Sequence, residues 1–197
     1  MNAQSLLLHE VARADRHASK LALRFRRAKI LAETAARLLS GADPDREVMP
    51  LLYRALSGER IIDATLGFVV VGLDRPLELG FMEGFDEEMV RRCVRLDFGQ
   101  AICGTVAATR QAMHVTGIQR SLDPLADLVR SAGIDAYACE PLIVGQRLLG
   151  TLSFATRSRR SFDPEDLIFF RDIAKHLAVA RDRQARRLMP DRTPVEG

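Results

Sequence analysis

Residues 136–156 read "AYACEPLIVGQRLLGTLSFAT". Two runs rich in apolar residues flank the dipeptide Gly145-Gln146, a pattern typical of a tight turn between antiparallel strands. Within the second run the character of the side chains alternates, and successive residues of a strand point to opposite faces of a sheet. The stretch therefore predicts a β-hairpin.

The two faces of the second predicted strand differ in size and polarity. One face, expected to pack against the terminal helices, is large and apolar: Leu148, Leu152 and Phe154. The other is mostly small and partly polar: Leu149, Thr151, Ser153 and Ala155. Tyr137 and Cys139 extend this second face from the neighbouring strand. A face of this kind leaves room and hydrogen-bonding groups for close packing under residues 98–135, or for a small ligand beneath them.

The segments around the hairpin supply further strands and helices. Expected helices span residues 45–56, 86–93, 124–131 with Asp123 as N-cap, and a final helix from Pro164 capped by Asp163 and Asp166. Expected strands are "ATLGFVVVG" (64–72) and "LELGFM" (77–82), joined by a turn at 73–76, and Met113–Thr116. This order predicts an α+β fold in which an antiparallel sheet is flanked by helices.

A long helix precedes these elements. Its apolar positions recur at alternating steps of four and three residues: Leu7, Val11, Ala14, Ala18, Leu21, Phe25, Ala28, Ala32, Ala35 and Leu39. A period of 3.5 residues predicts the seam of a coiled coil, and Gly41 and Pro44 end the pattern. We therefore expect a dimerisation and signalling helix at 1–40, a globular domain at 41–188 and a flexible tail at 189–197. The seam predicts a homodimer.

The basic charge of the chain is concentrated in this helix. The formal net charge is +3, and residues 1–40 carry eight Lys or Arg against three Asp or Glu, a net +5. One face could bind nucleic acid or an anionic membrane: Arg13, His17, Lys20, Arg24 and Arg27. Because no aromatic residues are interleaved for base stacking, a solvated outer face of a dimer is the preferred interpretation. No run reaches the roughly 20 apolar residues that span a bilayer, and three cysteines lack the spacing of a disulfide scaffold, so we expect a cytoplasmic protein.

A single cysteine stands at the centre of "FGQAICGTVAATRQAMHVTGI", residues 98–118. Cys103 lies between Gly99 and Gly104 near an expected helix start, where the pKa of a thiol can fall enough to make it a nucleophile. Free cysteine is also one of the most often buried residue types, and we favour a place in a pocket wall. Four-ligand zinc spacing is missing, so no metal is expected.

These residues resemble a known family. The stretch 98–118, together with "DPLADLVRSAGIDAYACEPLIVGQRLLGTLSF" (123–154) and "RSFDPEDLIFFRDIAKHLAVA" (160–180), is similar to GAF domains, with the resemblance covering about residues 30–185. It is closest to the GAF domains that precede the kinase core of bacterial sensor histidine kinases. The resemblance implies a PAS-like sheet flanked by helices, a ligand pocket between the sheet and residues 98–135, and dimerisation through the terminal helices. Since no kinase, cyclase or DNA-binding region is visible, a separate signalling partner such as a kinase or regulator is expected.

Two ligand classes known in GAF domains find no support in the residues. Bilin-binding members carry a Cys-His pair where this chain has Pro124 and Leu125, so no covalent bilin is expected. Members that bind cyclic nucleotides carry an Asn-Lys-Phe-Asp-Glu signature, of which "SRRSFDPEDL" (158–167) retains only an acidic part.

A third possibility is an enzyme resembling the free methionine-(R)-sulfoxide reductases of this family. Their two cysteines ten residues apart match Cys93 and Cys103. The reaction needs an attacking thiolate, a resolving thiol and carboxylates that hold the substrate. The third cysteine and three carboxylates of that group fall here on Arg130, Tyr137, Ser153 and Ala155. The dithiol is present and the carboxylates are missing.

The sequence thus predicts a non-enzymatic sensory protein that binds a small cytoplasmic ligand and signals through a helical dimer. The residues expected to contact the ligand are Phe81, Phe98, Gln100, Cys103, Thr105, His114, Arg130, Tyr137, Cys139, Thr151 and Ser153. The alternatives are the reductase, with Cys103 and Cys93 as catalytic residues, and a regulator associated with nucleic acid or membrane through the basic helix. No cofactor is assigned.

Overall fold

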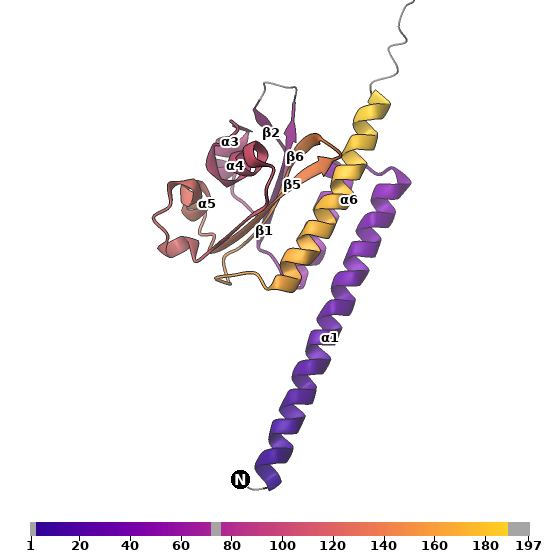
Figure 1. The fold of residues 1–197 in the computed structure, drawn as a ribbon, viewed down its shortest axis with the longest axis vertical. Helices are drawn as coiled ribbons and strands as arrows, with labels where there is room; N and C mark the ends of the chain where they lie inside the picture. Colours follow the sequence, from indigo (N-terminus) through magenta and orange to yellow (C-terminus); the bar gives the residue numbers. More distant parts are fainter. Residues whose placement is uncertain (1–2, 72–75, 189–197) are drawn as a thin grey trace, which may run out of the picture.

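A computed structural model, which describes residues 3–71 and 76–188, confirms the α+β fold (Figure 1). Six antiparallel strands form one sheet in the order β3-β2-β1-β6-β5-β4. The strands are β1 (Ala64–Val70), β2 (Leu77–Glu83), β3 (Arg95–Leu96), β4 (Met113–Thr116), β5 (Ala136–Val144) and β6 (Arg147–Thr156). Helices α1 (Ala3–Ser40) and α6 (Pro164–Leu188) lie on one side of the sheet, and α3 (Glu87–Cys93), α4 (Ala101–Thr109) and α5 (Asp127–Ser131) lie on the other.

Most boundaries follow the local signals in the sequence. The expected hairpin is formed by β5 and β6, and β4 covers the residues predicted for it. The Asp123 carboxylate accepts from the Leu125 N–H, as an N-cap should. The Asp166 carboxylate accepts from the Asp163 N–H at the start of α6, which is half of a capping box.

Two details differ from the prediction. The helix expected at 45–56 begins as a π-helix, η1 (Pro44–Val48), and continues as α2 (Met49–Gly58). The short strand β3, which was not predicted, pairs with β2. The turn predicted at 73–76 lies largely outside the described residues, and so does the tail predicted at 189–197.

A β-bulge in β6 reverses the faces expected for two leucines. Leu142 opposes Gly150, whereas the next residue, Ile143, opposes Leu148, so Leu149 is the extra residue of the bulge. Leu149 therefore packs on the α6 side of the sheet and Leu148 on the α4 side, opposite to the prediction. The rest of the predicted apolar face is confirmed beyond the bulge, since the ring of Phe154 stacks on Phe170 of α6 at 4.0 Å.

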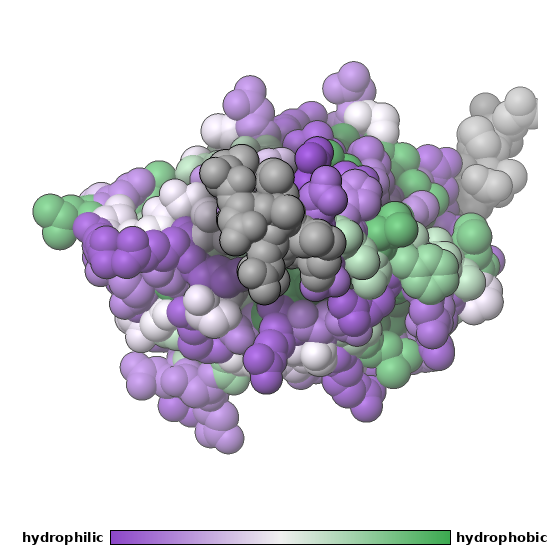
Figure 2. All heavy atoms as spheres, turned by 90° about the horizontal axis from the view of Figure 1, so that it is seen from below, coloured by the Kyte–Doolittle hydropathy of each residue, from purple (hydrophilic) through white to green (hydrophobic). Residues whose placement is uncertain are grey.

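Helix α1 is continuous over 38 residues and lies beside α6, while its N-terminal part extends past the domain (Figure 1). The face packed against the domain is formed by Arg27, Ile30, Thr34 and Leu38. The predicted coiled-coil seam points elsewhere: Leu21, Phe25 and Leu39 are 63%, 73% and 72% exposed. Seen from below, hydrophobic side chains gather at the surface among hydrophilic ones (Figure 2). In the part of the chain that the structure describes, no helix is long and apolar enough to cross a membrane.

Candidate functional site

The sheet separates two hydrophobic cores, and the candidate site lies in the one covered by α3, α4 and α5. Helix α4 brings Cys103 onto the sheet. Gly104 allows this approach, because a Cβ at that position would lie 2.2 Å from the carbonyl oxygen of Asp97. The Gln100 side chain accepts a hydrogen bond from the Asp97 N–H and fixes the start of the helix. Cys103 is consequently buried against β5 and β6.

Five of the predicted ligand residues meet at this point. The Sγ atom of Cys103 lies 3.1 Å from the Tyr137 hydroxyl and 3.4 Å from the Ser153 hydroxyl. Cys139 is the cross-strand partner of Ser153, and Thr151 lies two residues further along the same face of β6. We call these residues the Cys103 cluster: Cys103, Tyr137, Cys139, Thr151 and Ser153. All five are buried.

The hydroxyl of Thr151 also belongs to this polar group. Its Oγ1 atom is fully buried and has no well-aligned hydrogen-bond partner among the described residues. It lies against the thiols of Cys103 and Cys139, and its interaction with Cys103 helps to lower the pKa of that thiol. The five side chains therefore form one polar cluster inside an otherwise apolar core.

The thiols in this region differ in pKa. A hydrogen bond with Cys139 lowers the pKa of Cys103 to about 7, and hydrogen bonds with Ser153 and Tyr137 help to outweigh the opposing effect of burial. Burial raises the pKa of Cys139 and of Tyr137 well above their ordinary values. Burial also raises the pKa of Cys93 to about 12. Cys103 is thus the thiol of this group that most readily ionises.

A small closed cavity of about 10 Å³ adjoins the cluster. It holds at most one water molecule. Its lining comprises Leu66, Phe68, Met89, Cys93, Leu96, Ala101, Ile102, Cys103, Leu125, Leu128, Val129 and Tyr137. None of these described lining residues carries a charge at neutral pH while the thiols are protonated. The expected pocket region is therefore present beneath residues 98–135, but side chains fill nearly all of it.

An open hollow of about 440 Å³ lies directly outside this cavity. The two spaces share four lining residues: Leu96, Ala101, Leu125 and Leu128. Leu125 and Leu128 are partly exposed and belong to the short helical segment 124–131. This segment is the wall that separates the cavity from solvent.

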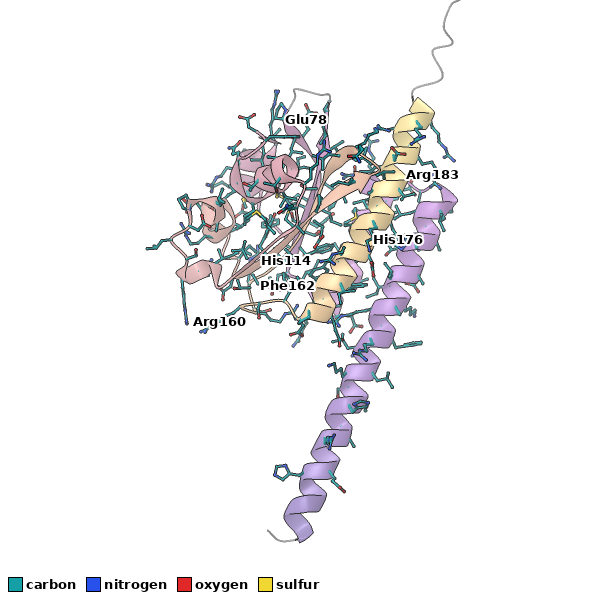
Figure 3. All side chains as sticks on the ribbon, in the orientation of Figure 1. Glu78, His114, Arg160, Phe162, His176 and Arg183 are labelled. Carbon is teal, nitrogen blue, oxygen red and sulfur yellow. The ribbon has the colours of Figure 1, made fainter. Side chains whose placement is uncertain are left out.

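Two predicted ligand residues lie on the other side of the sheet. Phe81 belongs to the α6-side core, where its ring occupies the space over Gly67. The Nε2 atom of His114 lies 2.9 Å from Oε1 of the buried Glu140, and the His114 side chain is labelled in Figure 3. Glu140 neighbours Cys139 in the strand, so its side chain projects to the opposite face. Neither residue joins the Cys103 cluster.

Four further predictions fall near the site but outside the cluster. Phe98 is 45% exposed, and Gln100 lines only the open hollow. The hydroxyl of Thr105 donates to the carbonyl of Ala101 within α4. Arg130 does not point inward: its guanidinium donates to the carbonyl of Ser121 at 2.8 Å and pairs with Asp127.

The apolar half of the cavity, which includes Phe68 and Met89, was not predicted. Phe68 opposes Thr151 across β1 and β6. Its place follows from this register, which joins segments more than 80 residues apart. The alternation within "ATLGFVVVG" alone does not say which face turns toward α4.

The basic face of α1 is largely engaged within the chain. Glu165 of α6 lies 3.4 Å from Lys20, 2.7 Å from Arg24 and 3.3 Å from Arg27. Arg27 also pairs with the buried Asp166. Three of the five basic residues suggested for nucleic acid or membrane thus face the acidic start of α6, and this weakens that alternative.

The geometry required for a reductase is present only in part. Cys93 and Cys103 line the same cavity and both are free thiols. Within the described lining there is no carboxylate to bind a substrate or deliver a proton. No group of three His, Cys, Asp or Glu residues suited to a metal ion occurs in 3–71 and 76–188.

Comparison with known proteins places these features in context. The GAF domain model matches residues 26–180. No curated protein matches the chain in sequence. Among solved structures, the GAF domain of a phosphoenolpyruvate-protein phosphotransferase from Coxiella burnetii is similar at 20% identity, with a TM-score of 0.69, over 84% of this chain and 98% of that one.

Two other solved structures extend the comparison. A free methionine-R-sulfoxide reductase from Neisseria meningitidis, in complex with its substrate, gives 20% identity and a TM-score of 0.65 over 81% of this chain and 91% of that one. A GAF domain/HD domain protein from Geobacter sulfurreducens gives 22% identity and a TM-score of 0.59 over 76% and 98%. At these identities the similarity shows the fold, and function must be argued from the site.

Proposed function

Because the chain belongs to the GAF domain family, a small-molecule-binding regulatory fold, we propose that it is a non-enzymatic sensory protein. It binds a small cytoplasmic molecule at the Cys103 cluster, between the sheet and helices α3 to α5. It forms a homodimer through α1 and acts on a separate signalling partner.

The polar cluster inside an apolar core is the observation that carries this proposal. The Cys103 cluster places three hydroxyls and two thiols together on the buried sheet face beneath residues 98–135. Two of its members, Cys103 and Tyr137, line the closed cavity. A ligand that enlarged this cavity would meet a mostly apolar wall with a few polar groups, which is the usual form of a small-molecule site.

The wall of the cavity supports a route for the ligand. Leu125 and Leu128 border both the closed cavity and the open hollow. An outward displacement of residues 124–131 joins the two spaces without disturbing the sheet. Within residues 124–131 only Ala126 and Val129 are buried, and so little packing favours local opening of the wall.

The exposed seam of α1 supports the dimer. Leu21, Phe25 and Leu39 are large apolar side chains left in solvent on one helix, and such a row is typical of a surface that another chain covers. The same helix packs on α6 through its opposite face, which connects the dimer seam to the sensory domain.

Native mass spectrometry tests the proposal directly. Protein isolated from cells under non-denaturing conditions should show the mass of a dimer plus a ligand, and the extra mass should disappear on denaturation. Thr151→Val should retain less of the ligand, because it removes one hydroxyl of the Cys103 cluster and keeps the shape of the side chain. A monomer with no added mass in every preparation would contradict the proposal.

A second candidate is a thiol-dependent methionine sulfoxide reductase. The observation that favours it is the pair of free thiols on one cavity, with the pKa of Cys103 lowered to about 7. Turnover of free methionine sulfoxide coupled to thioredoxin, lost in Cys103→Ser, would establish it. The absence of a carboxylate among the described lining residues makes the sensory function the better supported one.

A further inference from the structure

We infer that Cys103 and Cys139 form a site of oxidative modification, at which hydrogen peroxide converts the two thiols to a reversible disulfide. The inference concerns the chemistry of two sulfur atoms and goes beyond the proposed ligand-binding function. It requires neither a retained ligand nor a reductase activity. The disulfide connects α4 to β5 within the Cys103 cluster.

The positions of neighbouring hydroxyls bring the two sulfur atoms together. The Sγ atom of Cys103 lies 3.4 Å from the hydroxyl of Ser153, and Ser153 is the cross-strand partner of Cys139. Directly opposed side chains of adjacent strands are neighbours on one face of a sheet. The hydroxyls of Ser153 and Thr151 interact with both thiols, and the two thiols share a hydrogen bond. Sulfur atoms in such contact can be joined by rotation of their side chains.

The two thiols are suited to different steps of the oxidation. The thiolate, and not the thiol, is the form that attacks peroxide. The hydrogen bond from the Cys139 thiol lowers the pKa of Cys103 to about 7, whereas burial raises the pKa of Cys139 well above its ordinary value. At neutral pH about half of Cys103 is therefore ionised, while Cys139 keeps its proton. Cys103 reacts first, and Cys139 resolves the intermediate.

Cys93 is the less suitable partner, although it lines the same cavity as Cys103. The charge of Cys103 helps to raise the pKa of Cys93, but the hydrogen bonds that lower the pKa of Cys103 come from Cys139 and from hydroxyls of β5 and β6. Cys139 is the first of these causes. The pair that we expect to bond is therefore Cys103 with Cys139, which differs from the pair used by the reductase alternative.

Hydrogen peroxide matches the restricted access to this site. Cys103 is buried but lines the closed cavity of about 10 Å³, which holds at most one water molecule. Peroxide is uncharged and larger than water by one oxygen atom. Local opening of residues 124–131 admits it, because Leu128 lines both the cavity and the open hollow outside. Larger or charged oxidants would need a wider opening of the same wall.

The reaction balances over two steps. In the first, the Cys103 thiolate attacks one peroxide oxygen, so that an S–O bond forms and the O–O bond breaks. The hydroxide that leaves takes the proton of the Cys139 thiol and becomes water. In the second, the Cys139 thiolate attacks the sulfur of the sulfenic acid, so that the S–S bond forms and the S–O bond breaks. The second hydroxide takes a proton from solvent. Two electrons pass from the sulfur atoms to one peroxide, which leaves as two water molecules.

Peptide mapping of the full chain without reduction tests the pairing. The folded protein is treated with hydrogen peroxide at neutral pH, the remaining thiols are alkylated in denaturant, and the proteolytic peptides are identified by mass spectrometry. We expect two peptides joined through Cys103 and Cys139, which dithiothreitol separates, while Cys93 is recovered as an alkylated thiol. Oxidation of the denatured chain is the control, because this selectivity should be lost when the fold no longer positions the thiols.

Two variants distinguish the roles of the thiols. Cys139→Ser removes the resolving thiol, so the sulfenic acid on Cys103 should persist and be trapped by dimedone, a reagent for sulfenic acids. Cys93→Ser is the matched control, because it removes a thiol of the same cavity and should form the disulfide at the rate of wild type. Circular dichroism reports whether each variant is folded. Leu128→Ala should accelerate the oxidation and leave the pairing unchanged, since it thins the wall.

A disulfide between Cys93 and Cys103 in the folded wild-type protein would overturn the inference and would favour the reductase alternative. So would the failure of both wild type and Leu128→Ala to form a disulfide. Because the wild-type map identifies the bonded pair by itself, the test does not depend on the folding of a cysteine variant. None of these outcomes bears on ligand retention, which native mass spectrometry measures separately, so the two proposals can fail independently.

Discussion

The guanidinium of Arg181, on α6, donates a hydrogen bond of 2.7 Å to the backbone carbonyl of Phe68 in β1. The same guanidinium bonds to Asp45 at 2.6 Å. Arg181 is buried, and two glycines leave room for its guanidinium group. A Cβ at Gly80 would lie 3.2 Å from one of its nitrogens, and a Cβ at Gly150 would lie 2.9 Å from another. One side chain thus joins the last helix, the segment after α1 and the strand whose Phe68 ring lines the cavity.

Replacing Arg181 by methionine should destabilise the protein by about 3–5 kcal/mol, because the change leaves Asp45 and the carbonyl of Phe68 without their buried partner. Chemical denaturation measures this as a lower midpoint at an unchanged slope. Arg171→Met is the matched control on the exposed side of the same helix and should stay within about 0.5 kcal/mol. Equal effects of the two variants would contradict the role given to Arg181.

Replacing Gly150 by alanine should cost about 3–5 kcal/mol, from steric overlap and backbone strain together. The new Cβ would lie 1.9 Å from the carbonyl oxygen of Phe68, and φ at this position is +153°. Gly58→Ala provides the opposite case, because nothing lies within 4 Å of a Cβ there. That variant should stabilise the end of α2 by about 0.5–1 kcal/mol. The two midpoints should move in opposite directions.

Local patterns predicted the helices and hairpins, because each depends on neighbouring residues. The bulge at Leu149 could not be predicted from such patterns. It depends on Gly150 lying against Phe68 of β1 and Arg181 of α6, which are far from it in the sequence. The face of α1 that packs against the domain could not be predicted either, because it includes the polar residues Arg27 and Thr34. The spacing of apolar residues along the helix predicted only the exposed seam.

The same difference between local patterns and long-range contacts explains which site residues could be predicted. The polar residues of β5 and β6 were identified together, because alternation along one hairpin determines which side chains share a face. Phe81 and His114 lie on the opposite face of the sheet, and alternation within their own strands does not reveal this. The pairing of β2 with β1 shifts register at Gly80, and the orientation of β4 follows from its pairing with β5. The sequence left open whether Arg130 points into the site, and its hydrogen bond to the carbonyl of Ser121 shows that it does not.

Acid should loosen the contact between α1 and α6. A hydrogen bond from Arg24, aided by Lys20, lowers the pKa of Glu165 from 4.5 to about 2. A lowered pKa in the folded state means that the stabilisation is complete above pH 4.5 and is lost as the pH falls through 2. Glu165→Gln should therefore unfold earlier than wild type at pH 6, and the two midpoints should converge toward pH 2. Because the pair is exposed, added salt should also reduce the difference, and a constant difference across this range would contradict the assignment.

A charge in the seam of α1 should abolish the proposed dimer. Phe25→Glu places a carboxylate at a large seam residue that is 73% exposed, where two copies would repel each other. Light scattering should report a monomer, while circular dichroism reports an intact fold. Ala22→Glu is the control, because this exposed residue lies outside the seam positions of the same helix. If both variants stay dimeric, α1 is not the dimer interface.

The reactivity of the thiols should separate by pH. Because the pKa of Cys103 is about 7 and that of Cys93 is about 12, alkylation by iodoacetamide should rise for Cys103 with a midpoint near pH 7. Below pH 9, alkylation of Cys93 should remain slow, since the thiolate is the reacting form. Peptide mapping by mass spectrometry distinguishes the two sites. Cys139→Ala removes the first cause of the lowered pKa of Cys103, so the midpoint should rise.

Access to Cys103 contributes independently to the same measurement. The thiol is buried, so its rate of alkylation includes the population of the opened wall. Leu128→Ala should raise the rate at every pH without moving the midpoint, because Leu128 lines the wall and is not among the groups that set the pKa of Cys103. A shift in the midpoint would mean that the wall itself determines the acidity of the thiol. An unchanged rate would mean that the reagent reaches Cys103 by a route other than residues 124–131.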